Sequence, residues 1–251
     1  MFEYLPEIIK GLYTSLTLTM ASLLLALLLA VLFTIVLTMD FLRQRGECCG
    51  VKMQDAHPVA GFMARSIIKT PLLAPLVKIY ITLFTGTPLL VQIFLIYYGS
   101  GQFPSIREYP WLWDLLSQPW LCAMIALALN SAAYSTQLFY GTVRAIPQGQ
   151  WQACVALGMS RMQSLRILLP FALKRSLSSY SNEVILVFKS TSLAYTITLM
   201  EVMGYSQMIY GRTYDVMVFA ATAVVYLCIN GLLTLLMRLV EQRALAFERC
   251  N

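Results

Sequence analysis

Charged residues are scarce in this chain. They make up 12% of its 251 residues, whereas hydrophobic residues make up 59%. A soluble domain of this size usually carries about 25% charged residues. The shortage of charge argues against a soluble domain and indicates an integral membrane protein.

Motifs for chemistry at a bound group are also missing. His57 is the sole histidine, and the six cysteines form no C-x-x-C pair, so metal-site and disulfide interpretations are weak. The chain has no G-x-x-x-x-G-K-S/T motif and cannot cradle a nucleotide in that manner. We therefore expect no catalytic residue, no metal and no cofactor bound by this chain.

Long apolar runs are abundant instead. A bilayer core of about 30 Å needs roughly 20 apolar residues in a helix. We expect an all-α, polytopic membrane protein with one domain over residues 1–251 and five transmembrane helices. The fourth span is the poorest because it contains Lys189 and Glu201, so its interior should face protein or water rather than lipid. The expected spans are 14–39, 76–98, 120–140, 184–203 and 216–237.

Basic residues are distributed unevenly between the two sides that these spans define. Because cytoplasmic loops retain Lys and Arg, we expect the N-terminus outside and the C-terminus inside. The net charge of +6 follows from this bias, and no nucleic-acid partner is needed to explain it. Fourteen basic residues lie on the expected inner side: Arg43, Arg45, Lys52, Arg65, Lys69, Lys78, Arg144, Arg161, Arg166, Lys174, Arg175, Arg238, Arg243 and Arg249. Three lie on the outer side: Lys10, Arg107 and Arg212.

The segment 144–175 between the third and fourth spans has a regular pattern for a connecting loop. The stretch before Gly158 is compatible with a helix, Gly158 can stop it, and Ser160 can cap a second helix. Pro170 then marks a new start or a kink. Two short helices with an apolar face would form a knob that docks into a groove on another protein. Alternatively, they would lie in the membrane interface.

Seven residues of this segment occur in a recognisable order: Gln152, Ala153 and Cys154, then Gly158, Ile167, Leu169 and Pro170. This order resembles the EAA loop of bacterial ABC importer permeases, with Gln152 and Cys154 in place of the usual Glu and second Ala. In that family the loop forms coupling helices that sit in a cleft of the ATPase subunit. The resemblance implies the same role for these seven residues.

Other blocks carry the resemblance over nearly the whole chain. They are Gly11-Leu12 with Thr14 and Leu16, Phe84 to Gln92, Ala133 to Gln150, and Lys189 to Leu193. These blocks are similar to the polar amino-acid permeases of the same family. Residues 40–70 do not fit that pattern and look like an inserted loop.

The resemblance implies a permease subunit in the bacterial cytoplasmic (inner) membrane that imports a basic amino acid such as arginine. It implies an ABC ATPase dimer as partner, and the ATPase would hold the ATP and Mg²⁺. It also implies a second permease subunit, which we expect to be a different chain, and a periplasmic amino-acid-binding protein. Lipid surrounds the spans, and no nucleic acid is expected.

Polar residues and helix breakers within the spans are candidates for the transport pathway. Gly86 and Pro88 should bend the second span, and bends at membrane depth either line a pathway or serve packing. Lys189 can snorkel toward the cytoplasmic surface or pair with Glu183 or a partner chain. The candidate pathway residues are Gly86, Thr87, Pro88, Gln92, Gln137, Lys189, Ser190, Thr191, Ser192 and Tyr195.

Acidic residues are missing from the centres of the expected spans. This absence disfavours an ion-coupled secondary transporter, the main alternative, since such proteins use midplane carboxylates and inverted repeats. It also means that no carboxylate at the centre of a span is available to bind arginine, although a guanidinium group binds best to a carboxylate or an aromatic face. We therefore expect the second permease to supply the acid, with Tyr195 as an aromatic face in this chain.

Overall fold

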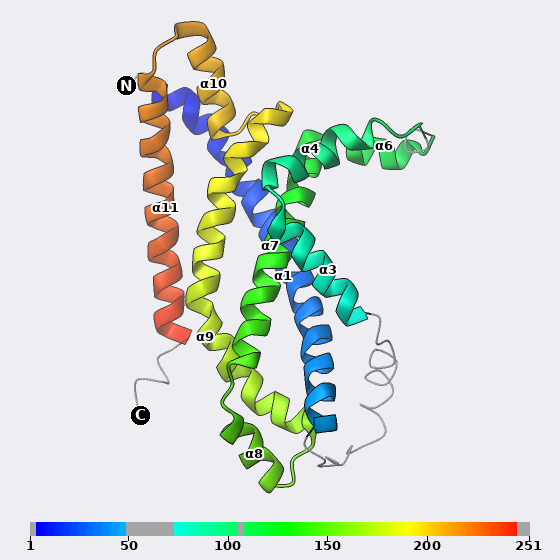
Figure 1. The fold of residues 1–251 in the computed structure, drawn as a ribbon. Helices are drawn as coiled ribbons and strands as arrows, with labels where there is room; N and C mark the ends of the chain where they lie inside the picture. The colour runs from blue at the N-terminus through cyan, green and yellow to red at the C-terminus, as the bar shows by residue number, and fades with distance from the viewer. Residues whose placement is uncertain (1–3, 49–72, 105–107, 245–251) are drawn as a thin grey trace.

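The computed structural model describes residues 4–48, 73–104 and 108–244 (Figure 1). The described residues form helices and connecting turns, with no strand among them, which confirms the all-α expectation. The elements are α1 (Leu5–Cys48), α3 (Leu73–Gly86), α4 (Leu89–Ser100), α6 (Pro110–Leu116), α7 (Pro119–Arg144), α8 (Gln148–Ala156), α9 (Arg161–Ser190), the 3₁₀ helix η2 (Thr191–Ile197), α10 (Val202–Thr213) and α11 (Met217–Ala244).

Three of these helices are long and apolar enough to cross a membrane by themselves, namely α1, α7 and α11. Two further pairs meet the criterion only together. The pair α3 and α4 is bent by 104°, and α9 with η2 is bent by 47° against α10. The described residues therefore provide three to five candidate spans, and five results if each bent pair is one span.

Helix α7 lies at the centre of the molecule and packs against α1, α9, α3 and α4 (Figure 1). Its buried face is rich in small residues, including Ala123, Ala126 and Ala133, which are 0% exposed. Small residues let helix backbones approach closely where lipid offers no hydrophobic drive for association. This packing fixes the α7 face that the candidate site uses.

The bend expected at Gly86 and Pro88 is a complete break between α3 and α4. The Gln92 amide nitrogen donates to the carbonyl oxygens of Phe84 (2.9 Å) and Thr87 (3.1 Å). Asn130 on α7 donates to the same Phe84 oxygen at 3.0 Å. A buried carbonyl without a partner is costly, so these two amides stabilise the break at membrane depth.

The fourth span differs most from its expected bounds of 184–203. Helix α9 runs through Pro170 without ending there, stops at Ser190 and continues as η2. Thr198 adopts a left-handed conformation (φ 65°), and the Glu201 carboxylate caps α10. Polar residues such as Ser181, Asn182 and Glu183 lower the hydropathy of α9 before residue 184, so a search by hydropathy favours a later start than the helix has.

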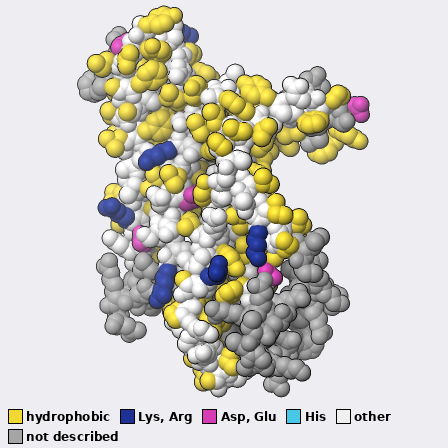
Figure 2. Space-filling view, viewed as in Figure 1, with side chains coloured by type: hydrophobic (Ala, Val, Ile, Leu, Met, Phe, Trp, Pro, Cys, Tyr) yellow, Lys and Arg dark blue, Asp and Glu magenta, His cyan; other side chains and the backbone are white. Residues whose placement is uncertain are grey.

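Helix α1 is longer than the expected first span. It continues to Cys48, so residues 40–48 of the expected inserted loop are helical, and residues 49–70 lie outside the described part. Asp40 forms an exposed ion pair with Lys78 on α3 at 3.5 Å. Most of the Lys and Arg side chains visible in Figure 2 lie on the half of the molecule that carries α8.

Candidate functional site

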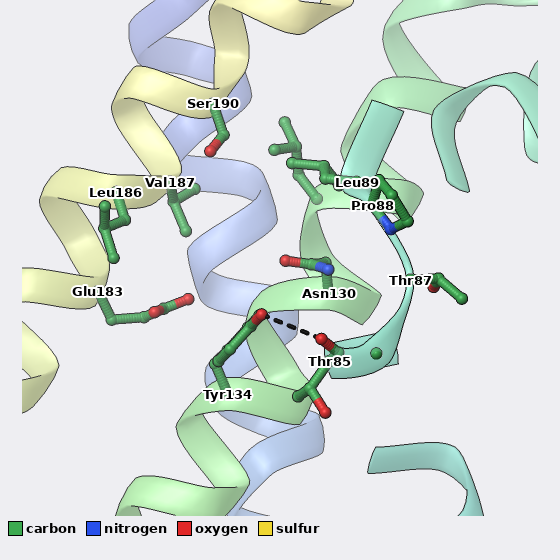
Figure 3. Close-up of a pocket in the computed structure, with 12 residues that line it drawn as sticks. Thr85, Thr87, Pro88, Leu89, Asn130, Tyr134, Glu183, Leu186, Val187 and Ser190 are labelled. Atoms are coloured by element: carbon green, nitrogen blue, oxygen red, sulfur yellow. Dashed lines mark hydrogen bonds between the residues drawn. The ribbon is translucent and has the colours of Figure 1, made fainter. Parts of the chain in front are cut away.

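A cavity of about 480 Å³ opens beside the break between α3 and α4 (Figure 3). Three elements build its wall: the α3–α4 break, one face of α7 and the last turns of α9. The lining mixes hydroxyl, amide and carboxylate groups with apolar side chains. The lining residues are Thr85, Gly86, Thr87, Pro88, Leu89, Leu127, Asn130, Tyr134, Glu183, Leu186, Val187 and Ser190.

Glu183 on α9 is the one charged residue among those that line this cavity. Its side chain is buried, at 7% exposure, and one carboxylate oxygen accepts a hydrogen bond of 2.8 Å from the Ser131 hydroxyl. Ser131 lies at the midpoint of α7, so Glu183 sits midway along the bundle. The expectation that no acidic residue lies near the centre of a span is therefore wrong.

Hydrogen bonds hold the wall opposite Glu183. Asn130 donates through its amide nitrogen to Phe84 and also to the Gln92 side-chain oxygen at 3.1 Å. The Tyr134 hydroxyl donates to the Thr85 carbonyl oxygen at 3.3 Å, the dashed line in Figure 3. The polar groups on this wall are thus positioned before any substrate arrives, which reduces the entropic cost of binding.

A second cavity of about 490 Å³ lies beside the first, along α7 and α9. It shares Tyr134, Glu183 and Leu186 with the first cavity, and its other residues lie nearer to the α8 end of both helices. The two cavities therefore adjoin each other along these helices and share the Glu183 carboxylate. The second cavity is lined by Tyr134, Gln137, Leu138, Ser179, Asn182, Glu183 and Leu186.

The structure divides the residues that the sequence suggested for the pathway. Gly86, Thr87, Pro88 and Ser190 line the first cavity, and Gln137 lines the second. The other candidates line neither cavity. They are Gln92, Lys189, Thr191, Ser192 and Tyr195.

The candidates that line neither cavity differ in burial and contacts. Gln92 is buried and holds the α3–α4 break, while Thr191 is buried and bonds the Phe188 carbonyl oxygen. Lys189 is exposed and forms no ion pair with Glu183 within the described residues. Lys189 also lies at the C-terminal end of α9, which is the end away from α8, because α9 runs from Arg161 to Ser190.

The expected coupling segment forms a compact turn of two helices. Gly158, between α8 and α9, has φ +70°, a left-handed conformation that glycine adopts without strain. The Ser160 hydroxyl and the Gln163 side chain form a capping box at the start of α9. The second helix is the whole of α9 and not a short element, so one continuous helix connects this turn to the cavity-lining residues.

The expected coupling residues face two directions. Cys154 is buried in a cluster with Val143 and Leu168, and Leu169 packs against that cluster. Gln152, Ala153, Gly158, Ile167 and Pro170 are exposed. Leu157, which the sequence analysis did not single out as a site residue, is 72% exposed at the end of this turn.

Known proteins resemble this chain along its length. A family model described as binding-protein-dependent transport system inner membrane component matches residues 57–245. The arginine ABC transporter permease protein ArtM of Escherichia coli (strain K12) is 68% identical over 251 residues, covering all of both chains. ArtM of Haemophilus influenzae is 50% identical over 248 residues, covering 98% of this chain and 96% of the relative.

Two solved structures share the fold. One is described as an amino acid ABC transporter with histidines, with a TM-score of 0.74 and 23% identity, covering 97% of this chain and 96% of the other. The other is the inward-facing MetNI methionine ABC transporter, with a TM-score of 0.62 and 14% identity, covering 94% of this chain and 95% of the other.

Proposed function

The chain belongs to the family of binding-protein-dependent transport system inner membrane components, as its motifs predicted, and we propose that it is the permease subunit of an ABC importer that carries arginine or another basic amino acid into the cytoplasm. The names of the two ArtM relatives support arginine as the substrate. The structural observation that carries the proposal is the Glu183 carboxylate in the cavity between α7 and α9.

The cavity chemistry suits a basic amino acid. Ser131 engages one oxygen of Glu183, and the other oxygen can accept a charge-assisted hydrogen bond from a guanidinium group. Tyr134 adds an aromatic face to the same wall. The Asn130 side-chain oxygen can accept from an α-ammonium group, and the Ser190 hydroxyl can donate to an α-carboxylate.

A second permease subunit is the partner that would close this cavity. Leu186 and Tyr134 line it and are 47% and 39% exposed, so the wall continues to the outside of the chain. The sequence suggested a second permease different from this chain, because no carboxylate was expected at the centre of its spans. Glu183 supplies such a carboxylate, and Tyr195, the expected aromatic face, lines neither cavity. A second permease of different sequence stays a proposal, which uptake measured with and without that subunit can test.

The α8 turn is the proposed docking site for the ATPase dimer. Leu157, Ala153 and Gly158 present a small, uncharged surface that fits an apolar cleft. Closure of the ATPase around ATP and Mg²⁺ would move α8, and α9 would carry that movement to Glu183. A periplasmic binding protein would dock at the opposite end of the molecule, and lipid would surround the spans in the inner membrane.

An ion-coupled secondary transporter is the second candidate. Glu183 is a midplane carboxylate of the kind such transporters use, which removes one earlier objection to it. The family assignment favours the ATP-driven importer. The two functions differ in a simple observable, since only the importer requires ATP and a partner ATPase.

The test is uptake of labelled arginine into proteoliposomes that contain this chain and its ATPase, with the binding protein supplied, with and without a second permease. We expect ATP-dependent uptake that Glu183→Gln lowers by about tenfold to a hundredfold, the effect of losing a charge-assisted hydrogen bond. Glu7→Gln, which removes an exposed carboxylate, should leave uptake unchanged. Uptake driven by an ion gradient without ATP, or a preference for acidic amino acids, would refute the proposal.

A further inference from the structure

The second cavity has a set of polar side chains that the proposed function does not use. On α9, Asn182 and Glu183 follow Ser179 by three and four residues, so the three side chains share one face of the helix. Leu186 continues this face. On α7, Gln137 follows Tyr134 by three residues on the facing surface. The polar groups of the second cavity thus extend the path from Glu183 toward the α8 end.

These polar groups are uncommitted. Gln137, Ser179 and Asn182 are exposed, and none makes a side-chain hydrogen bond within the described part of the chain. Other polar side chains on α9 are bonded: Ser176 and Ser181 both donate to carbonyl oxygens of their own helix. Gln137, Ser179 and Asn182 can therefore bind a substrate at the second cavity without first breaking a hydrogen bond within the described residues.

We propose that Gln137, Ser179 and Asn182 form a second station, which receives the α-amino and α-carboxylate groups of the substrate after they leave the first cavity. This inference rests on the proposed function. Amides and hydroxyls both donate and accept hydrogen bonds, so they can bind an ammonium and a carboxylate at once. Their lack of charge keeps the station weak, as release from a pathway requires.

Glu183 connects the two stations because it lines both cavities, together with Tyr134 and Leu186. A substrate can keep its guanidinium on this carboxylate while its amino-acid end turns from the Asn130 and Ser190 side to the Asn182 side. The cationic group then never loses its partner at membrane depth, where an unpaired charge is costly. Only the weaker hydrogen bonds of the amino-acid end are exchanged.

The test compares two measurements on the complete transporter: equilibrium binding of labelled arginine to the solubilised complex and ATP-driven uptake in proteoliposomes. For the double variant Gln137→Leu with Asn182→Leu, we expect binding within about twofold of the unaltered protein. Uptake should fall about tenfold, as expected for the loss of two hydrogen bonds. Asn230→Leu on α11 makes the same change outside both cavities and should leave both measurements unchanged.

Conservative replacements separate a binding role from a structural one. A second double variant, Gln137→Asn with Asn182→Ser, keeps a polar group at both positions. It should retain most of the uptake that the leucine variant loses. Normal uptake by the leucine variant, or parallel loss of binding and uptake, would overturn the second station. Failure of the proposed function would look different: Glu183→Gln would bind arginine as tightly as the unaltered complex does.

Discussion

Gly11 shows how one residue sets the spacing between two segments far apart in the sequence. A Cβ atom at this position would clash with the backbone of Glu201 and Val202, so α1 rests directly on the turn that precedes α10. Glu201 is 0% exposed and accepts hydrogen bonds from Ser15, Tyr226 and the first backbone amides of α10. The buried carboxylate thus joins α1, α10 and α11 at the end of the molecule opposite α8.

We expect Gly11→Ala to destabilise the protein by about 1–3 kcal/mol, because the methyl group must displace backbone atoms rather than a flexible side chain. The measurement is the thermal unfolding midpoint of the purified protein in detergent. Gly141→Ala is the matched control, since nothing lies within 4 Å of its added Cβ atom. An unchanged midpoint for Gly11→Ala would show that α1 and the Glu201 turn are further apart.

At the scale of elements, the α8–α9 turn depends on backbone conformation and not on space. Nothing lies within 4 Å of a Cβ atom added at Gly158, yet its φ of +70° is unfavourable for residues with side chains. A β-branched residue there costs roughly 1–2 kcal/mol, whereas asparagine tolerates the left-handed region. The turn can therefore be altered without steric damage.

Gly158→Val should leave the amount of protein in the membrane unchanged but reduce ATP-driven uptake, because the turn no longer holds α8 against α9. Gly158→Asn should retain most of the uptake. Membrane content is measured by immunoblot and coupling by the ratio of substrate transported to ATP hydrolysed. Equal ratios for the valine variant and the unaltered chain would remove this turn from the coupling mechanism.

The break between α3 and α4 depends on Gln92 in a similar way. Gln92→Leu removes the donor to the Thr87 carbonyl and frees Asn130 from its Gln92 partner. A hydrogen bond that is lost without replacement costs roughly 0.5–1.5 kcal/mol. We expect a lower unfolding midpoint together with weaker arginine binding, since Asn130 lines the first cavity. Thr82→Val, which removes an exposed hydroxyl bonded to its own helix, should change neither quantity.

At the scale of the whole molecule, the sequence predicted some parts and missed others for physical reasons. The segments 14–39 and 120–140 lie inside α1 and α7, and 216–237 begins one residue before α11, since a helix that meets lipid must be apolar. The expected bounds 184–203 cover the last turns of α9, η2 and the start of α10, because the earlier turns of α9 carry polar residues such as Asn182. Glu183 falls just outside these bounds, and its contact with Ser131 at the midpoint of α7 reveals its depth.

The conformation of the turn between α8 and α9 could be predicted more closely than the residues that line the two cavities. A left-handed glycine and a capping box are local features, which short sequence patterns specify directly. Pathway residues depend on which faces of α7 and α9 meet, which is a tertiary property. Tyr195 and Lys189 have suitable chemistry but lie on other faces, whereas Asn182 has no distinguishing pattern and lines a cavity.

The orientation of the whole chain remains a prediction, and it can be tested with two positions at opposite ends of the molecule (Figure 1). Leu157, beside α8, is 72% exposed, and Tyr214, between α10 and α11, is 77% exposed. In a variant with all six cysteines replaced, Leu157→Cys should react with a membrane-impermeant maleimide only in inverted vesicles. Tyr214→Cys should react only in spheroplasts. The physical reason is that fourteen basic residues lie on the α8 side of the expected spans and three on the other.

The chain should be expressed without its ATPase for this measurement, so that α8 stays accessible. A variant that retains Cys228 alone is the control, because this residue is exposed within the apolar helix α11 and lipid should shield it from both sides. The reverse labelling pattern would invert the orientation and place α8 outside, where no ATPase could reach it. Labelling of both positions from the same side would mean an even number of crossings between Leu157 and Tyr214. In that case α9, η2 and α10 could not form one bent span, and the path from Glu183 to Asn182 would not lead to the cytoplasm.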